Sequence, residues 1–385
     1  MTPHVHDLRA FEMSEDRGFL PHWDPIDRLP PWFSAWDDMG RELPKLLTTD
    51  HLRPALETMP ILDFSQLESR PERERAMMLL SYFGHAYVWG GGKVATRLPA
   101  SISIPWVRAS DYLGRPPVLS YASYALNNWR RIDPNGPVAL GNIVLQQNFL
   151  GGADEEWFIL VHIDIESKAA PALASFGPAL DAVRNDDADK LAKKLTTIAQ
   201  SLEQMCASLD RMPERCDPYI YFHRVRPYLY GWKDQPALPG GMIYEGAYGE
   251  TPQKFRGETG AQSGVIPTLD ALLGIRHGDD ALRSYLLEMR DYMPPAHRGF
   301  LEAVESGPSV REFVERHESA GKLRDVYNKG VALVHRFRAT HLEFAASYIH
   351  KQGSASLANP TDVGTGGTPF MPYLKKHRDE TTGIE

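Results

Sequence analysis

The C-terminal segment 326–348 repeats apolar residues three or four positions apart, or at the sum of those spacings, which predicts one long amphipathic helix. The stripe consists of Tyr327, Val331, Val334, His341, Ala345 and Tyr348. One member, His341, is polar and is flanked one turn away by Phe337 and Phe344. A histidine on such a face either bonds to a backbone carbonyl as a core residue or presents a ring nitrogen to a metal. The helical pattern alone leaves both interpretations open.

Helical spacing dominates the rest of the chain as well. Helices are predicted at 34–48, 72–89, 117–130, 175–209, 267–274, 279–291, 297–304, 309–317 and 320–351. Alternation of period two occurs only near 143–147 and 158–165, and both segments are also compatible with helix. The sequence therefore predicts an all-α fold.

Segments rich in turn residues suggest how the chain is divided. Residues 19–34 contain four prolines and are expected to form an extended arm. Residues 131–141 have the turn chemistry of a linker. We therefore expect a small N-terminal domain, residues 1–136, and a larger helical domain, residues 137–385. Within the larger domain, segment 181–209 alternates charged and apolar faces and is expected to belong to one unbroken scaffold helix.

The composition is that of an ordinary globular protein of 385 residues, with 42% hydrophobic and 24% charged residues. A formal net charge of −8 gives no reason to expect a nucleic-acid or acidic-membrane partner. The sequence has neither an apolar run of membrane-spanning length nor a signal-peptide pattern. Cys206 and Cys216 lie outside any C-x-x-C-H motif and are expected to be free thiols in the cytoplasm. The oligomeric state stays open, with a monomer favoured.

A segment rich in glycine, serine and threonine, residues 353–368, follows the predicted C-terminal helix and is suited to closing over a site. Phe337–Leu342 (FRATHL), followed by Gly364–Thr368 (GTGGT), resembles the C-terminal signature of the indoleamine 2,3-dioxygenases. Further segments resemble the family in the same order: Leu98–Ile102 (LPASI), Tyr121–Trp129 (YASYALNNW), Tyr228–Trp232 (YLYGW), Tyr244–Gly246 (YEG), Leu269–Ile275 (LDALLGI), Met289–Arg298 (MRDYMPPAHR) and Pro308–Phe313 (PSVREF).

The resemblance implies a two-domain helical protein whose larger domain holds haem b. It implies an enzyme that uses O₂ to cleave the indole C2–C3 bond of L-tryptophan or a related indoleamine, giving N-formylkynurenine. His341 would be the axial ligand of the iron, with its second ring N–H bonded to a carbonyl, a carboxylate or water. Arg338 would pair with Asp270 and help to hold a propionate. Gly260 and Ala261 belong to a small-residue loop that would approach the macrocycle.

The opposite side of the haem is expected to come from a distant segment. The resemblance implies that Phe158 packs against the indole and that residue 162 lines the oxygen pocket. His162 departs from the familiar indoleamine enzymes, which have serine there, and is similar to the distal histidine of the tryptophan 2,3-dioxygenases. A neutral imidazole accepts a hydrogen bond from an indole N–H better than a hydroxyl does. We therefore expect His162 to fix the indole ring.

Arg226 matches the family arginine that grips the substrate carboxylate, a task suited to a planar guanidinium fork. The other expected substrate contacts are Tyr121, Tyr221, Phe222, Thr259 and Thr365. Tyr221 stands where the family commonly has phenylalanine, and Thr259 where it usually has serine. The shape of the pocket therefore stays open.

Three other interpretations remain at this point. His162-Ile163-Asp164 has the H-x-D pattern of a non-haem iron site, which normally lies on the strands of a β-barrel and needs a distant second histidine. A haem-binding sensor would need His341 but no carboxylate clamp. A haem-dependent monooxygenase or ring-rearranging enzyme, acting on a substituted indole in secondary metabolism, would use the same residues.

Overall fold

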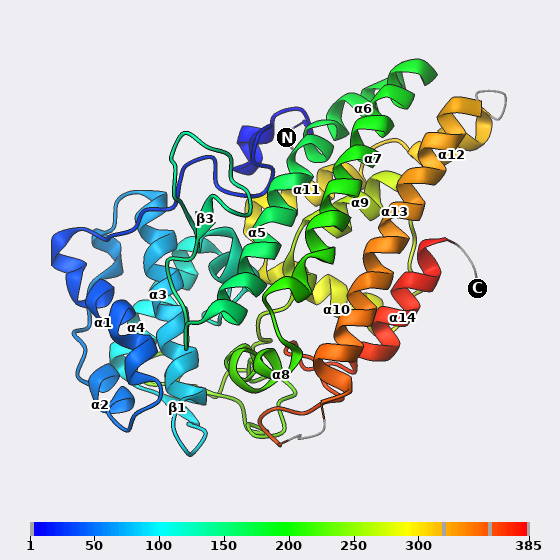
Figure 1. Cartoon of the computed structure of the whole chain (residues 1–385). Helices are drawn as coiled ribbons and strands as arrows, with labels where there is room; N and C mark the ends of the chain where they lie inside the picture. Colours follow the sequence, from blue (N-terminus) through cyan, green and yellow to red (C-terminus); the bar gives the residue numbers. More distant parts are fainter. Residues whose placement is uncertain (1–3, 318–320, 353–355, 383–385) are drawn as a thin grey trace.

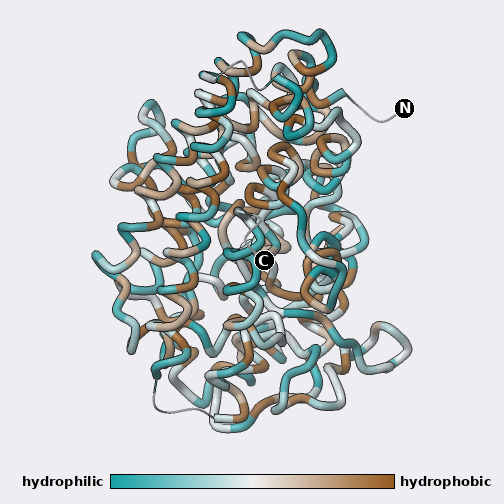
Figure 2. Tube along the Cα trace, turned by 90° about the vertical axis from the view of Figure 1, so that its right-hand side faces the viewer, coloured by the Kyte–Doolittle hydropathy of each residue, from teal (hydrophilic) through white to brown (hydrophobic). Residues whose placement is uncertain are grey.

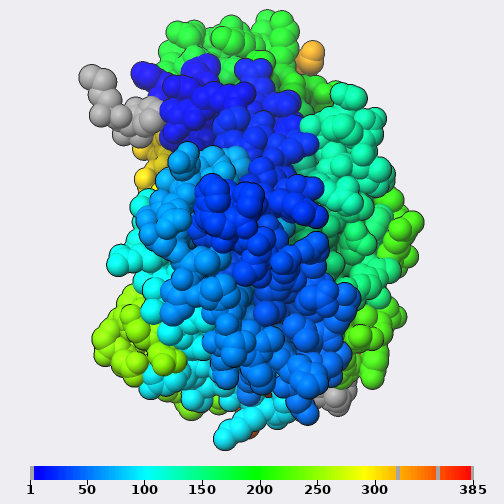
Figure 3. All heavy atoms as spheres, turned by 90° about the vertical axis from the view of Figure 1, so that its left-hand side faces the viewer, coloured from blue at the N-terminus to red at the C-terminus, as the bar shows by residue number. Residues whose placement is uncertain are grey.

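The computed structural model describes residues 4–317, 321–352 and 356–382. Four helices from the N-terminal part lie together on one side of the molecule: α1 (Ser34–Leu46), α2 (Leu52–Glu57), α3 (Arg70–Trp89) and α4 (Ala100–Leu113). Figure 3 shows that this part of the chain, drawn in blue, makes up most of one face. The longer helices of the rest of the chain lie beside it, to the right in Figure 1.

Three long helices form the centre of that second part: α5 (Ala153–Ala174), α7 (Ala188–Asp210) and α13 (Gly321–Ala345). Helix α7 packs against both α5 and α13, and α14 (Phe370–Thr381) packs on the other side of α13 (Figure 1). The remaining α-helices are α6 (Phe176–Arg184), α8 (Pro218–Ile220), α9 (Val265–Leu273), α10 (Ala281–Met289), α11 (Pro295–Glu305) and α12 (Val310–Arg316).

The strands are only two residues long. β1 (Arg97–Leu98) pairs in parallel with β4 (Ile243–Tyr244), and β2 (Arg130–Arg131) pairs antiparallel with β3 (Ile143–Val144). The rest of the regular structure consists of short 3₁₀ helices at Leu8–Phe11, Pro31–Phe33, Phe64–Gln66, Met212–Glu214, Arg226–Tyr228, Tyr248–Glu250, Gly260–Gln262 and Arg290–Tyr292. The predicted all-α fold is confirmed.

Three single turns of π-helix interrupt the helical pattern, at Ala122–Leu126, Tyr221–Val225 and Ala346–His350. Turns of this kind are rare and occur frequently at functional sites, because the extra residue redirects neighbouring side chains. The first adjoins Tyr121 and the second contains Tyr221, both of which the sequence places in the site, while the third continues the helix that carries His341.

Two apolar clusters hold the protein together. One is built mainly on α1, α3 and α4 and includes Trp36 and Trp106; the other is built on the helices from α5 onward. Helix α5 serves both, because Ile159 and Ile163 face the first cluster while Val161 and Ile165 face the second. Figure 2 shows the matching mixture of hydrophobic (brown) and hydrophilic (teal) positions along the trace. The predicted division at residues 136 and 137 stays a prediction.

The expected unbroken helix over 175–209 is wrong. The chain forms α6 and α7 with a turn between them, in which Asp186 adopts the left-handed conformation at φ 54°. The next residue, Asp187, begins α7 because its side chain accepts a hydrogen bond from the backbone N–H of Lys190. Asn185-Asp186-Asp187 is thus a capping sequence, since short polar side chains favour such turns and helix starts.

Other differences between the predicted and the observed helices occur where the sequence shows no clear apolar stripe. The predicted helix at 117–130 is only the π turn Ala122–Leu126, whereas 158–165 lies within α5 and is helical. Helices α2, α4 and α14 were absent from the predicted pattern. The long C-terminal helix is confirmed as α13, and Val334 and Ala345 of the predicted stripe are buried on it. Its other buried residues are Leu323, Gly330, Leu333 and Arg338, whereas His341 of the predicted stripe is exposed. Arg338 is buried there because it has ionic partners, which an apolar pattern does not reveal.

Candidate active site

His341 lies in the last part of α13, which ends at Ala345 and continues directly into the third π turn, Ala346–His350. Its side chain is exposed, yet the surrounding protein desolvates it enough to lower its pKa to about 4, and the charge of His162 adds to this. The imidazole of His341 is therefore accessible to a ligand and stays neutral near pH 7.

The ring of His341 makes no hydrogen bond to any described residue. The expected bond from its second N–H to a protein carbonyl or carboxylate is therefore missing from this part of the chain. An accessible, neutral imidazole whose nitrogens have no partner among the described residues is the donor that a haem iron requires. On the observed chemistry of this donor, the residues present fit a haem.

Arg338, one turn before His341, belongs to a buried polar network. Its Nη2 donates to Asp270 Oδ2 at 2.5 Å, and its Nη1 donates to Thr381 Oγ1 at 2.7 Å. His277 lies 3.2 Å from the same Asp270 oxygen and 2.8 Å from Glu380 Oε2. Burial alone would raise the pKa of Asp270, but the charge of Arg338 and the bonds of His277 lower it below its usual value. The predicted Arg338–Asp270 contact is confirmed, and its role toward a propionate stays a prediction.

We call His341, Arg338, Asp270 and His277 the α13 wall. The network of this wall ties α9, α13 and α14 together, because it draws one side chain or more from each helix. A buried arginine that donates to a carboxylate and a hydroxyl has little freedom to move. The position of the neighbouring histidine is therefore set by ionic contacts and not by apolar packing alone.

His162 on α5 lies close enough to His341 for its charge to lower the pKa of His341. Its Nδ1 lies 2.7 Å from the backbone oxygen of Phe158. A carbonyl oxygen only accepts, so Nδ1 carries the proton and Nε2 keeps a free lone pair. Desolvation by burial lowers the pKa of His162, which keeps the ring neutral. The geometry thus leaves an unoccupied hydrogen-bond acceptor.

Aromatic rings surround this acceptor. The ring of Phe158 lies 4.7 Å from that of His162 and 4.7 Å from that of Tyr221, measured between centroids. Tyr124 lies 6.4 Å from Phe158, and Tyr121 lies 6.0 Å from His162. We call these five residues the α5 wall. Such spacings are typical of offset or edge-to-face packing and would suit a flat aromatic ligand.

Arg226 is completely buried. Its guanidinium donates to Asn359 Oδ1 at 2.6 Å, to the Pro360 carbonyl at 2.7 Å and to the Val363 carbonyl at 2.5 Å. Its carbon centre also lies over the ring of Phe222, at 5.5 Å from the centroid. The predicted carboxylate clamp therefore holds the C-terminal loop in this structure, while its Nε has no partner.

The GTGGT segment lies against the loop that contains Thr259, Gly260 and Ala261. Thr365 Oγ1 donates to the backbone oxygen of Glu258 at 2.6 Å. Gly257 allows this close approach, because a Cβ there would overlap the backbone of Leu229 and Gly231. Gly260 is exposed with open space around it, as expected of a residue that a macrocycle could approach. Residues 353–355, where the predicted closing segment begins, lie outside the described residues.

Two carboxyl groups near the α5 wall escaped the sequence analysis. Glu166 lies one turn after His162 and accepts a hydrogen bond from Ser263 Oγ at 2.7 Å; burial raises its pKa to about 7. Glu258 is buried too, and desolvation raises its pKa to about 8. The signal for Glu166 was its spacing from His162 on one helix, and the signal for Glu258 was a single charge among small residues.

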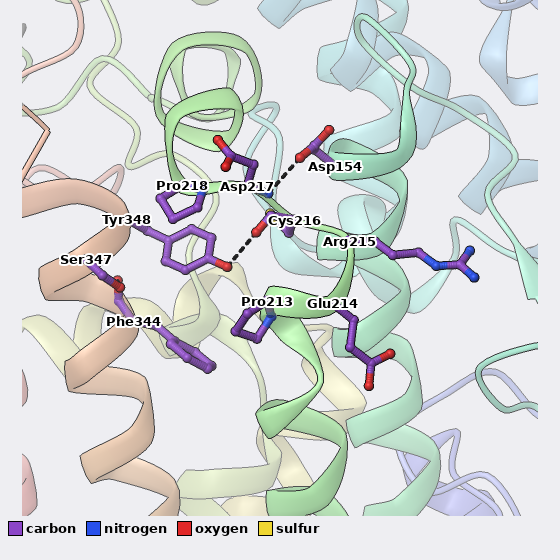
Figure 4. A pocket seen from close by; sticks show the side chains of 10 residues that line it. All are labelled: Asp154, Pro213, Glu214, Arg215, Cys216, Asp217, Pro218, Phe344, Ser347 and Tyr348. Atoms are coloured by element: carbon purple, nitrogen blue, oxygen red, sulfur yellow. Dashed lines mark hydrogen bonds between the residues drawn. The ribbon is translucent and has the colours of Figure 1, made fainter.

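A separate cavity of about 430 Å³ opens beside the end of α13 (Figure 4). Its lining consists of Asp154, Pro213, Glu214, Arg215, Cys216, Asp217, Pro218, Phe344, Ser347 and Tyr348. Two hydrogen bonds cross it, from Tyr348 to the Cys216 carbonyl at 2.6 Å and from the Asp217 N–H to Asp154 at 2.7 Å. None of the predicted site residues lines it, so this cavity is not the candidate active site.

The non-haem iron interpretation fails on geometry. His162 and Asp164 lie on a helix and not on a strand, so their side chains point in different directions. Asp164 is engaged by Ser208 at 2.5 Å and by the Leu140 N–H at 3.0 Å. Across the described ranges, no three histidine, cysteine or acidic side chains gather as a metal site would require. Among these same residues, no helix is long and apolar enough to cross a membrane.

Comparison with known proteins agrees with this geometry. A family model described as "Indoleamine 2,3-dioxygenase" matches residues 7–384. The chain is 39% identical to indoleamine 2,3-dioxygenase 1 of Rattus norvegicus, over 97% of this chain and 94% of that protein. It is 34% identical to indoleamine 2,3-dioxygenase acdA of Aspergillus candidus, over 97% and 96%. It is 31% identical to the indoleamine 2,3-dioxygenase of Saccharomyces cerevisiae, over 97% and 92%.

Proposed function

Because the chain belongs to the indoleamine 2,3-dioxygenase family of haem-dependent oxidoreductases, which act on indoles with O₂, we propose that it cleaves the C2–C3 bond of L-tryptophan or a related indoleamine. The product would be N-formylkynurenine or its analogue. The observation that carries this proposal is the free Nε2 of neutral His162, which lies beside the ring of Phe158.

Haem b would be held by His341 as the axial ligand, with Gly260 and Ala261 bordering the macrocycle. When bound, the haem supplies the iron that activates O₂. The chain's own contribution at this side is to keep the imidazole of His341 neutral and in place. Arg338 and Asp270 do so through their 2.5 Å contact, which fixes α13 against α9.

His162 is proposed to accept the hydrogen bond of the indole N–H at Nε2. The Phe158 carbonyl keeps the proton on Nδ1, so the ring needs no tautomeric change when the substrate binds. Phe158 and Tyr221 would pack on the faces and edges of the indole, and the buried setting excludes water from it. Holding the ring in one orientation directs a single bond toward the oxygen.

Arg226 is proposed to bind the substrate carboxylate after its contacts with segment 359–363 are exchanged. A carboxylate is a stronger acceptor for a guanidinium than the amide and carbonyl oxygens that it holds now. Tyr121, Phe222, Thr259 and Thr365 would border the amino-acid part of the substrate. The exchange would couple substrate binding to movement of the closing loop.

A second candidate activity is oxygenation or rearrangement of a substituted indole. Tyr221 favours it, because a hydroxyl-bearing ring in place of the family's usual phenylalanine changes the wall that Phe158 faces. For either activity, we place the enzyme in the cytoplasm as a monomer. The two free, buried cysteines are compatible with that reducing compartment.

The test is incubation of the haem-loaded ferrous protein with L-tryptophan and ¹⁸O₂, followed by mass measurement of the product. Two labelled oxygens in a kynurenine-type product are expected. One labelled oxygen would favour the monooxygenase activity. If the haem-loaded protein forms no oxygenated product from any indole offered, the proposal is contradicted.

A further inference from the structure

Glu258 is an unusual residue for the position that it occupies. Only 5% of its surface is exposed, and no described residue donates a hydrogen bond to its carboxyl group. Its backbone is fixed on both sides, since its N–H donates to the Leu229 carbonyl at 3.0 Å and its own carbonyl accepts from Thr365. A buried carboxyl group without a partner is costly, so it calls for an explanation.

The surroundings place this carboxyl group at the α5 wall. Its charge raises the pKa of four buried tyrosines, although desolvation is the larger cause for each: Tyr82, Tyr121, Tyr124 and Tyr221. Tyr121 contacts the ring of His162, while Tyr124 and Tyr221 contact that of Phe158. The loop that carries Glu258 also borders this wall, because Gln262 Oε1 accepts a hydrogen bond from the Tyr121 N–H at 2.9 Å. The carboxyl group of Glu258 therefore lies near the proposed indole site.

The protein's own cations nearby do not neutralise it. Arg256, two residues before, pairs with Glu288 at 2.8 Å and with Asp234 at 3.2 Å. The donors of Arg226 that have partners are held by segment 359–363. A carboxyl group that the fold leaves unpaired beside a binding site is suited to a cation that arrives with the ligand.

We infer that Glu258 is a specificity-determining residue that receives the protonated amino group of the indole substrate. This inference rests on the proposed function and identifies the amino group as the part of the substrate that Glu258 recognises. An ammonium group on the side chain of the indole would supply the missing donors. Indoles with an amine should therefore be preferred over indoles that carry only a carboxylate, because the latter would place two acids close together.

The first experiment compares three ligands on the haem-loaded ferric protein by the shift of the haem absorption band. Tryptamine carries only an amine, L-tryptophan carries an amine and a carboxylate, and indole-3-propionate carries only a carboxylate. Glu258→Gln is expected to weaken tryptamine and L-tryptophan roughly tenfold or more. Binding of indole-3-propionate should stay the same or tighten. Glu258→Asp, which keeps the charge, should retain part of the amine preference.

A matched control is Glu166→Gln, which changes another buried carboxyl group near the same wall. Because Glu166 already accepts a hydrogen bond from Ser263, its loss should not separate amines from carboxylates. The inference is overturned if Glu258→Gln changes all three ligands equally, or if it leaves the preference of the wild type intact. If the wild type binds none of the three indoles, the proposed function itself fails.

A measurement on the wild type covers the case in which Glu258→Gln does not fold. The carboxyl group, with its pKa of about 8, is mostly protonated at pH 7, so an arriving ammonium should displace its proton. Calorimetry of tryptamine binding in buffers of different ionisation enthalpy should detect release of close to one proton at pH 7. The groups that face Glu258 and could share this charge are Tyr82, Tyr121, Tyr124 and Tyr221, which all stay neutral at that pH. Absence of proton release would overturn the inference, while binding itself would leave the proposed function standing.

Discussion

The α13 wall and the α5 wall are built on opposite principles. The α13 wall is an ionic network, in which Arg338 and His277 both contact one oxygen of Asp270, while Asp270 Oδ1 and His341 have no partner among the described residues. The α5 wall is aromatic and holds polar groups whose bonding capacity is unused, at His162 and beside it at Glu258. Protein partners fix the first wall, while the second keeps its unused groups for a ligand. The first wall is therefore suited to hold a permanently bound cofactor, and the second is suited to bind a substrate that is exchanged in each turnover.

The largest expected effect is on the α13 wall. Asp270→Ala would leave Arg338 buried without its carboxylate, and should lower the free energy of unfolding by about 3–5 kcal/mol. Denaturation in urea measures this. The control Glu305→Ala removes the partner of Arg290 from a more exposed pair and should cost about 0–1 kcal/mol. Equal losses in the two variants would remove the contrast between a structural network and an ordinary surface pair.

At the α5 wall, removal of a buried acid should raise the free energy of unfolding instead of lowering it. The pKa of Glu258 is raised in the folded protein, so its contribution to stability is present below the unfolded value of about 4.5 and is lost as the pH rises through about 8. Glu258→Gln should therefore stabilise the haem-free protein by about 1–4 kcal/mol at pH 8, and by little at pH 4.5. Urea denaturation at the two pH values measures the difference. A variant that is less stable at pH 8 would mean that the carboxyl group has a protein partner after all.

The effect of replacing His162 should depend on whether the substrate has an indole N–H. His162→Ala should lower kcat/KM for L-tryptophan roughly tenfold, because the indole N–H loses its acceptor. The same variant should affect 1-methyltryptophan much less, since that ligand has no N–H to donate. Steady-state kinetics on both substrates provide the measurement. Equal losses would reduce His162 to a residue that only shapes the pocket.

The smallest expected effect is on the closing loop. Thr365→Val removes one hydrogen bond to the Glu258 carbonyl. It should lower the free energy of local opening of the loop by about 0.5–1.5 kcal/mol. Hydrogen exchange should then quicken at the amides of Gly364 and Gly367, which bond within the loop. Amides in the middle of α7 serve as the internal reference and should not change. Unaltered exchange at both glycines would show that other contacts, such as that of Arg256 with Gly366, hold the loop.

The sequence predicted those parts of the fold that local rules determine. The C-terminal helix α13 follows from its spacing, and α3 was predicted to within two residues of its start. The break before α7 was missed, because an Asn-Asp-Asp turn can be distinguished from an exposed helical face only by its surroundings. The π turns were also missed, since they arise from packing across the site and leave no periodic signal.

The site was predicted chiefly through resemblance. Arg338 and Asp270 are far apart in the chain, and no spacing rule would have paired them. Arg226 shows the limit of that approach, because its present partners come from a loop whose position only the fold reveals. Glu258 was hidden among small residues, and its importance depends on its burial and lack of a partner. Neither property can be read from the sequence.

The two histidines of the site are expected to have different tasks, with His341 binding the iron and His162 binding the substrate. Titration of the haem-free protein with haem, followed by absorption spectra, distinguishes these tasks in His341→Ala and His162→Ala. His341→Ala should lose stable haem binding, while His162→Ala should keep the haem spectrum of the wild type. A His341→Ala variant with an unchanged haem spectrum, or loss of haem from His162→Ala alone, would contradict this expectation.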